Sequence, residues 1–185
     1  EVLAALTSAL CHDLDHPGHN NGFEVSCESQ LALLYCEDAV LERHHAHMAF
    51  QILREPGSDI TANLKPDEKK SFRKMVFEAI LGTDMARHFR HVEFLDKHSA
   101  PNAPLSREDP NHRVHFMSAI VHCADLSGQA MKPELAHEWG RRCIQEFRHQ
   151  AEKEANLGLP VTPFMANLDN ELKQQSSTTL GSTLA

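Results

Sequence analysis

The sequence of 185 residues has few aromatic side chains and no long apolar run. Aromatic residues make up 6%, while Ala, Leu, Glu, Lys and Gln are plentiful, a balance that favours helices over sheets. No apolar stretch approaches about 18 residues, so we expect no membrane-spanning helix in this chain. No segment alternates apolar and polar residues as strands do. We therefore predict an all-α fold, a compact domain of several helices.

The chain also lacks a paired cysteine motif and an excess of positive charge. Its five cysteines are odd in number and include no C-x-x-C pair, so we expect reduced, mostly buried thiols in an intracellular, cytoplasmic protein. The formal net charge of −8 argues against nucleic-acid binding, which needs a clustered basic face. It does not argue against an anionic ligand, because a bound divalent cation can supply positive charge locally.

The chain begins inside an apolar helical pattern, without a methionine or a signal sequence. We interpret it as a piece of a longer protein, which could be associated with a membrane through other segments. Residues 1–166 carry the periodic pattern of one domain. Residues 167–185 are polar, small and weakly periodic, and we predict an irregular tail there.

Apolar periodicity and capping residues predict the helices. The first, over residues 1–14, is apolar all round and should be buried, and the DHPGHNNG string ends it. A long helical region starts at Pro66, with a break or kink expected at Gly82 to Asp84. Further helices are expected over 26–35, 38–55, 112–127 and 132–158, with Gly158 as a C-terminal stop.

One stretch, CHDLDHPGHNN over residues 11–21, is not explained by helix packing. Imidazole and carboxylate groups suit Zn²⁺, and carboxylates also suit Mg²⁺ or Mn²⁺. If the helix reaches Asp13, then His12 and Asp13 can point toward one cavity, with Asp15 and His16 orienting them. A solvated helix end with polar capping residues is the structural alternative.

A metal site needs ligands from elsewhere in the chain. Asp125 follows an apolar helical stretch, and a carboxylate buried there needs a cation or hydrogen-bond donors. A salt bridge between Asp125 and an arginine is the alternative. Glu42 and His45 share a helix face at i, i+3 and can hydrogen-bond a metal-bound water. Asp84, at the expected break, is either a helix cap or a site residue.

Taken together, these segments resemble the catalytic domain of class I cyclic-nucleotide phosphodiesterases. The matching strings are ALCHDLDHPGHNN, LLYCEDAVLERHH, LGTDMARHF, VHCADLS with KPELAHEWGRRCIQEF, and LGLPVTPFM. They are collinear and extend from residue 1 to near residue 165. The resemblance implies that residues 1–166 are part of a compact all-helical domain. It also implies two divalent metals, Zn²⁺ and Mg²⁺ (or Mn²⁺), at the bottom of a nucleotide pocket.

The resemblance assigns roles to residues that match the family's motifs. Three would be ligands of the zinc-like ion, namely His12, Asp13 and Asp125, and the second of these would also bridge to the other metal. Four would hold the metal-bound waters, namely His16, Glu42, His45 and Asp84. Three would contact the substrate, namely Asn21, Phe164 and Met165, although core packing is an alternative for the last two.

The implied reaction is hydrolysis of a 3′,5′-cyclic nucleotide, cAMP or cGMP, to a nucleoside 5′-monophosphate. A hydroxide that bridges the two metals would attack the phosphorus. One alternative is a catalytically inactive homologue that binds a nucleotide or a partner protein. Another is a different HD-type phosphohydrolase, against which the TDMARHF and ADLS strings argue.

The sequence departs from the family's pattern in three places. The HNxxHA motif, which carries the general-acid histidine and one more zinc ligand, lies upstream of Glu1, so we expect the printed chain alone to have weak or no catalysis. The purine-binding glutamine is not assigned, because Gln174 and Gln175 lack the expected Gly-Phe context. Gly128 stands where some cAMP-selective relatives carry asparagine, which leaves the choice between cAMP and cGMP open.

Overall fold

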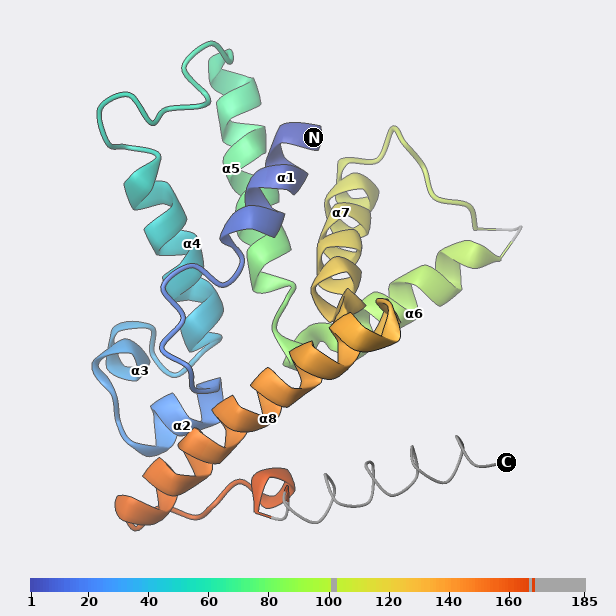
Figure 1. The fold of residues 1–185 in the computed structure, drawn as a ribbon. Helices are drawn as coiled ribbons and strands as arrows, with labels where there is room; N and C mark the ends of the chain where they lie inside the picture. The colour runs from blue at the N-terminus through green and yellow to red at the C-terminus, as the bar shows by residue number, and fades with distance from the viewer. Residues whose placement is uncertain (101–102, 167, 169–185) are drawn as a thin grey trace. The chain divides into compact units, whose positions relative to one another are not determined.

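The structure is a computed structural model that describes residues 1–100, 103–166 and 168. Over these residues the chain is helical and contains no strand, which confirms the all-α prediction (Figure 1). In chain order the elements are α1 (Val2–Cys11), α2 (Asn21–Ser26), α3 (Gln30–Leu34), α4 (Val40–Ile52), α5 (Pro66–Leu81), η1 (Met85–Arg87), α6 (His88–Ser99), α7 (Pro110–Asp125), η2 (Leu126–Ala130), α8 (Pro133–Asn156) and η3 (Pro163–Met165).

The chain divides into two compact units. The first comprises Glu1–Pro17 and Gln30–Ser127, and the second comprises Gly18–Ser29 and Gly128–Ala185. The predicted tail begins at residue 167, and its residues other than Leu168 lie outside the part that the structure describes, Gln174 and Gln175 included.

The core of the first unit lies where α1, α5 and α7 run side by side (Figure 1). α5 supplies apolar side chains at the spacing of one helix face, namely Phe72, Met75, Val76, Ala79 and Ile80. α7 supplies Val114, Met117 and Val121, and α4 adds Ala46 against α5. Burial of this apolar surface is the main favourable contribution to folding of the unit.

α1 differs from the expectation of a helix that is buried all round and extends to residue 14. It ends at Cys11, and its buried residues are Ala4, Thr7 and Ser8. Leu6 and Leu10 are 65% and 84% exposed. The reason is that α5 and α7, with a smaller contribution from α4, cover only one face of α1 among the described elements.

The break predicted in the long helical region is confirmed. α5 ends at Leu81, and Asp84 caps the next turn by accepting a hydrogen bond from the Ala86 amide at 2.9 Å. Gly82 lies so close to α7 that a Cβ atom added to it would collide with the Ser118 hydroxyl. The absence of a side chain at position 82 therefore allows α5 and α7 to approach closely at this end.

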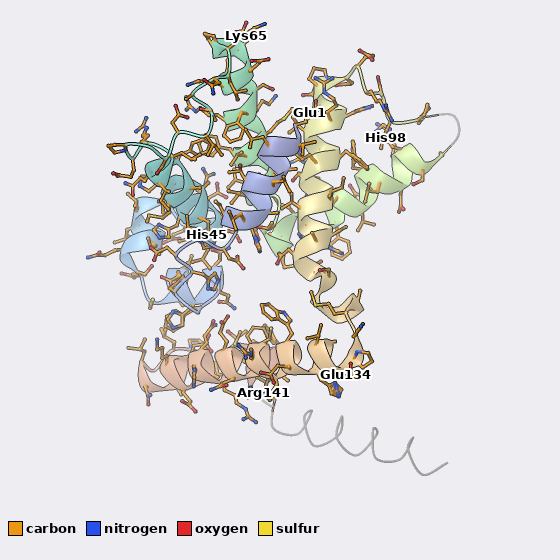
Figure 2. The ribbon with its side chains drawn as sticks, turned by 45° about the horizontal axis from the view of Figure 1, so that its top comes forward. Glu1, His45, Lys65, His98, Glu134 and Arg141 are labelled. Carbon is orange, nitrogen blue, oxygen red and sulfur yellow. The ribbon has the colours of Figure 1, made fainter. Side chains whose placement is uncertain are left out.

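The second unit is built on the 24-residue helix α8, whose charged side chains include Glu134 and Arg141 (Figure 2). Gly158 follows the helix with φ of +69°, which confirms the predicted C-terminal stop. The short helix α2 was not expected, because the DHPGHNNG string predicts the end of a helix and not the start of one. Asn20 caps α2 by accepting a hydrogen bond from the Phe23 amide at 2.8 Å.

A buried polar network joins three segments of the second unit. The Gln150 side-chain oxygen accepts from the Asn20 amide at 2.9 Å, and its nitrogen donates to Glu154 at 2.8 Å. Glu154 also accepts a hydrogen bond from the Thr162 amide at 2.8 Å. Gln150 and Glu154 are both buried. These bonds fix the start of α2 and the segment before η3 against α8.

The cysteines differ from the expectation of mostly buried thiols. All five are free, and none is fully buried. Cys36 is exposed because it lies in a turn with φ of +54°, and Cys123 is exposed near the end of α7.

Among the described residues, none of the helices combines the length and the apolar character needed to cross a bilayer.

Candidate metal centre

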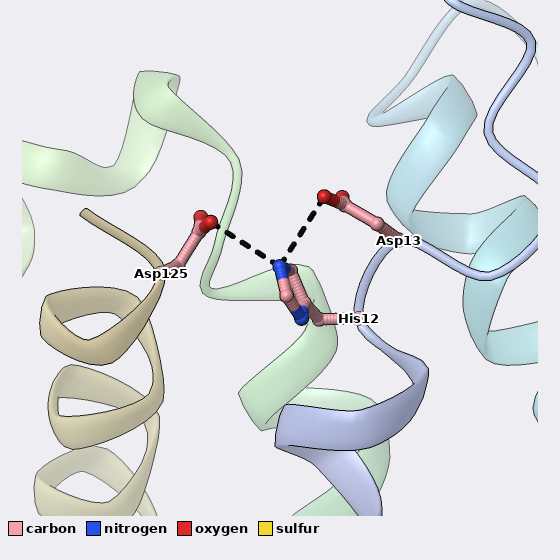
Figure 3. Close-up of side chains that lie close together, drawn as sticks. All are labelled: His12, Asp13 and Asp125. Carbon is pink, nitrogen blue, oxygen red and sulfur yellow. Dashed lines mark hydrogen bonds and ion pairs between the residues drawn. The ribbon is translucent and has the colours of Figure 1, made fainter. Parts of the chain in front are cut away.

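Three side chains meet where α1 ends and α7 ends. His12 is the C-cap residue of α1, Asp13 follows it, and Asp125 is the last residue of α7. The His12 Nε2 atom lies 3.2 Å from Asp125 Oδ1 and 3.3 Å from Asp13 Oδ2 (Figure 3). One nitrogen and two carboxylate oxygens thus lie within 4.8 Å of one another. The three predicted ligands are therefore neighbours, although 112 positions separate Asp13 from Asp125 in the chain.

The orientation of the His12 ring suits a metal ligand. Its Nδ1 atom lies 2.9 Å from the Ala9 carbonyl oxygen, to which Nδ1–H donates a hydrogen bond. In the neutral ring this bond leaves the lone pair on Nε2, which faces the two carboxylates. Histidine ligands of metals are commonly oriented by such a bond from the other ring nitrogen. The donor set of one imidazole and two carboxylates fits Zn²⁺ or another first-row divalent ion.

The two carboxylates create a strongly negative environment around His12. Hydrogen bonds to Asp125 and then Asp13 raise the pKa of His12 to about 10. The same contact with His12 lowers the pKa of Asp13. A bound divalent cation would replace the imidazolium as the positive charge that faces the two carboxylates, because Nε2 must release its proton to become a ligand.

Asp125 was expected to be buried in an apolar helix, and this expectation is wrong. Its side chain is 31% exposed, because Asp125 lies at the very end of α7 rather than within it. The arginine partner considered as an alternative is not present among the described contacts of Asp125, which pairs with His12. An exposed carboxylate at a helix end remains accessible to a cation from solvent.

His45 and His16 lie beside this cluster. His45 is buried on α4 at 2% exposure, and its Nδ1–H donates to the Leu14 carbonyl oxygen at 2.7 Å (Figure 2 shows its position). Its Nε2 atom is 3.9 Å from Asp13 Oδ1, and its ring stacks on His16 with centroids 5.5 Å apart. Burial lowers the pKa of His45, so the ring is neutral at pH 7.

Asp13 therefore presents its two carboxylate oxygens to different partners. Oδ2 faces His12, while Oδ1 faces His45. A carboxylate that presents its oxygens in this way can be shared between two neighbouring groups.

The other two residues predicted to hold waters have local surroundings of their own. Glu42 is half-buried in the first turn of α4, three positions before His45 as the sequence indicated. Asp84 is half-buried and caps η1, which matches the helix-cap alternative for this residue.

The contact between Asp15 and His44 was not predicted from the sequence. The His44 Nε2 atom lies 2.8 Å from Asp15 Oδ2, which ties the loop after α1 to α4. Asp15 has φ of +60°, a left-handed conformation that aspartate adopts more readily than most residues. The available signal was the DLDHPG string, in which an aspartate precedes a turn.

The residues predicted to contact substrate belong to the second unit. Asn21 is the first residue of α2 and is half-buried. Phe164 is 56% exposed on η3 and contacts Phe147 edge to face, with ring centroids 5.4 Å apart. Met165 is buried. Phe164 is thus accessible, whereas the burial of Met165 matches the core-packing alternative.

Comparisons with known proteins identify relatives over most of this chain. The family model described as 3′5′-cyclic nucleotide phosphodiesterase matches residues 1–180. The 3′,5′-cyclic-nucleotide phosphodiesterase regA of Dictyostelium discoideum is 39% identical over 165 residues, which are 89% of this chain and 21% of the relative. The human high affinity cGMP-specific 3′,5′-cyclic phosphodiesterase 9A is 38% identical over 167 residues, 89% of this chain and 27% of the relative.

A third relative is named for the other nucleotide. The probable 3′,5′-cyclic-AMP phosphodiesterase pde-4 of Caenorhabditis elegans is 34% identical over 168 residues, 88% of this chain and 25% of the relative. The crystal structure of the phosphodiesterase domain of the RhoPDE fusion protein from Salpingoeca rosetta matches with a TM-score of 0.84 and 38% identity. That match covers 92% of this chain and 54% of the solved one, so the chain spans about half of the solved domain.

Proposed function

The chain belongs to the 3′,5′-cyclic nucleotide phosphodiesterase family, and on that premise we propose that its protein hydrolyses cAMP, cGMP or both to the 5′-monophosphate. The observation that carries the proposal is the convergence of His12, Asp13 and Asp125 within 4.8 Å. Relatives named for cGMP and for cAMP match at similar identity, so the proposal names both nucleotides.

We assign two divalent cations to this centre, Zn²⁺ and Mg²⁺ (or Mn²⁺). His12, Asp13 and Asp125 would hold the first ion through the nitrogen and oxygens that face one another. Asp13 would be shared with the second ion, because its Oδ2 atom lies near His12 while its Oδ1 atom lies 3.9 Å from His45 Nε2. Bound divalent cations supply charge neutralisation of the phosphate and lower the pKa of water.

The surrounding residues would orient the ligands and the waters. The Ala9 carbonyl holds the His12 ring in the tautomer with a free Nε2. His45 is neutral and presents Nε2 toward Asp13, so it can accept a proton or a hydrogen bond from water at that point. His16 would support the His45 ring by stacking, and Glu42 and Asp84 would complete the hydrogen bonding around the second ion.

We further propose that Asn21 and Phe164 contact the nucleotide. The exposed ring of Phe164 offers an apolar face for a planar base. The edge-to-face contact with Phe147 supports the Phe164 ring. Met165 was predicted beside it as a substrate contact, and its burial suits a supporting role in packing.

The test is metal content and cyclic-nucleotide hydrolysis by the full-length protein that contains this chain, compared with its Asp125→Ala variant. We expect the variant to lose turnover by about 1,000-fold or more and to retain less zinc, because one oxygen ligand is missing. Asp96→Ala is the matched control, since Asp96 is an exposed aspartate on α6 that forms no ion pair within the described structure.

Two outcomes would contradict the proposal. Near-normal turnover of Asp125→Ala would remove Asp125 from the site. A wild-type protein that binds zinc and nucleotide but does not hydrolyse either cyclic nucleotide would instead be an inactive homologue.

A further inference from the structure

A small cavity, chemically different from the metal centre, lies in the first unit between α5, α6 and α7. Its volume is about 220 Å³, and the lining residues include Lys74, Arg87 and Arg90. None of these three cations forms a side-chain hydrogen bond or ion pair within the described residues, and Glu78 is the one carboxylate in the lining. In a chain with a formal charge of −8, three unpaired cations around one small cavity are an unusual concentration of positive charge.

Two imidazoles line the same cavity, each with a buried nitrogen that has no hydrogen-bond partner. His91 is 5% exposed, and its Nε2–H donates to the Gly82 carbonyl oxygen at 3.0 Å. Its Nδ1 atom therefore carries a lone pair, and this atom is buried without a partner. The Nε2 atom of His115 is also buried without a partner. A buried polar atom without a hydrogen-bond partner costs folding free energy. A ligand that donates a hydrogen bond to such an atom would offset that cost.

Burial and, to a smaller extent, the neighbouring charges keep both imidazoles neutral. Burial, followed by the charge of Arg90, lowers the pKa of His115 to about 4. Burial also lowers the pKa of His91, with further contributions from Arg90, His88 and Arg87. At pH 7 the two rings are therefore acceptors of hydrogen bonds and not additional cations. His115 is held in place by stacking on Phe94, with ring centroids 4.0 Å apart.

The residues that line the cavity thus combine three unpaired cations with two imidazoles, each of which has a buried nitrogen without a partner. Cations suit the negative oxygens of a tetrahedral oxyanion, while unpaired imidazole nitrogens suit a P–OH group. The Glu78 carboxylate disfavours an anion without a proton and can itself accept from a P–OH group. The volume is below the 300–1,000 Å³ that is typical of pockets for drug-sized ligands, and so suits a small ion.

We propose that this cavity binds a protonated tetrahedral oxyanion, either hydrogen phosphate or the phosphoryl group of a phosphomonoester. In the bound state the oxyanion's P–O⁻ oxygens pair with Arg87, Arg90 and Lys74. Its P–OH group donates to the unpaired nitrogen of His91 or His115. This role does not depend on the proposed hydrolysis, because the cavity shares no residue with the His12, Asp13 and Asp125 cluster.

The test follows the imidazole signals of His91 and His115 by NMR while phosphate or sulfate is added to the full-length protein at constant ionic strength. Sulfate has the same shape and charge but carries no proton at pH 7. We expect saturable shifts with phosphate and binding weaker by about tenfold or more with sulfate, the loss expected for one charge-assisted hydrogen bond. Methyl phosphate, tested near its second pKa of about 6, distinguishes an ester from free phosphate.

Variants assign the binding to this cavity. Arg90→Gln should weaken phosphate binding by about tenfold or more, whereas Arg73→Gln, which removes an exposed arginine that lines a different cavity, should not. His115→Phe keeps an aromatic ring against Phe94 and should remove the preference for phosphate over sulfate. Circular dichroism and thermal melts of each variant check that it folds.

Three results would overturn the proposal. One is equal binding of sulfate and phosphate by the wild-type protein. The second is no saturable shift of either imidazole at millimolar phosphate. The third is phosphate affinity that is unchanged in folded Arg90→Gln and Arg87→Gln variants.

Discussion

The first unit contains two groups of histidines whose surroundings have opposite charge. At the end of α1, His12 lies between two carboxylates, which raise its pKa to about 10. Between α6 and α7, His115 is half-buried near Arg90, and burial together with that charge lowers its pKa to about 4. The same side chain is thus pushed toward the cationic form at one site and toward the neutral form at the other.

This difference determines which ligand each site can attract. A carboxylate-rich cluster that stabilises an imidazolium will also stabilise a metal cation in its place. A neutral imidazole among unpaired arginines offers an acceptor beside positive charge, which suits a protonated anion. The burial of the ring and the charges beside it, and not the histidine itself, decide between cation and anion binding.

The largest expected effect comes from removing the negative charge around His12. Asp125→Asn and Asp13→Asn should each lower the pKa of His12, because the hydrogen bond to Asp125 is the largest single cause of its rise and the hydrogen bond to Asp13 is the next. Zinc affinity should fall by about 100-fold or more in Asp125→Asn, since an amide is a poorer zinc ligand. NMR titration of the chelator-treated protein and calorimetry with zinc measure the two quantities. A His12 that still titrates near pH 10 in both variants would contradict this account.

A smaller effect is expected at Gly82, where α5 and α7 approach each other. Gly82→Ala places a Cβ atom against Ser118 Oγ, with the Glu78 carbonyl oxygen at 3.0 Å and His91 Nε2 at 3.2 Å. We expect a loss of about 1–3 kcal/mol in the free energy of unfolding, as for other overpacked sites. Gly140→Ala on α8 is the control, because a Cβ atom there meets no neighbour and alanine favours a helix. Chemical denaturation measures both, and equal stability of the two variants would contradict the close packing at Gly82.

Much of the helical framework could be predicted from local sequence signals. The break after α5 follows from Gly82 and Asp84, and the end of α8 follows from Gly158. The exposed face of α1 could not be predicted, because apolarity shows that a face can be buried but not what covers it. The helix α2 was missed because its first turn is capped by Asn20 inside a string that contains one proline and two glycines, residues that interrupt helices.

The ligands of the candidate site could be predicted from the sequence, but their surroundings could not. His12, Asp13 and Asp125 were named from their residue types and from the family resemblance, and the structure brings them together. The exposure of Asp125 was missed, because its position at the end of α7 depends on where the helix stops. The charge contrast with His115 was also missed, because it depends on which arginines the fold places beside each ring.

The buried imidazole of His91 and the half-buried imidazole of His115 should also make the first unit sensitive to acid. The pKa values of His91 and His115 are lowered mainly by burial, so the unfolded chain binds protons that the folded chain does not. Stability should therefore fall as the pH drops from about 6.5 toward about 4, by a few degrees of Tm per pH unit. His115→Phe should reduce this slope, whereas His47→Phe, at an exposed position on α4, should not. Thermal melts between pH 7 and pH 5 test the difference, and an identical slope in both variants would contradict it.

The smallest effect is expected at Asp15, a carboxylate that lies near the metal centre but supports the loop. Its Oδ2 atom is 2.8 Å from His44 Nε2, and its φ of +60° favours aspartate or asparagine. Asp15→Asn should change the free energy of unfolding by less than about 0.5 kcal/mol and leave zinc affinity unchanged, because it keeps both a hydrogen-bonding group and the left-handed conformation. Asp15→Val should cost about 1–2 kcal/mol through backbone strain. A fall in zinc affinity for Asp15→Asn close to that for Asp125→Asn would instead make Asp15 a ligand, and the negative cluster around His12 would then include a third carboxylate.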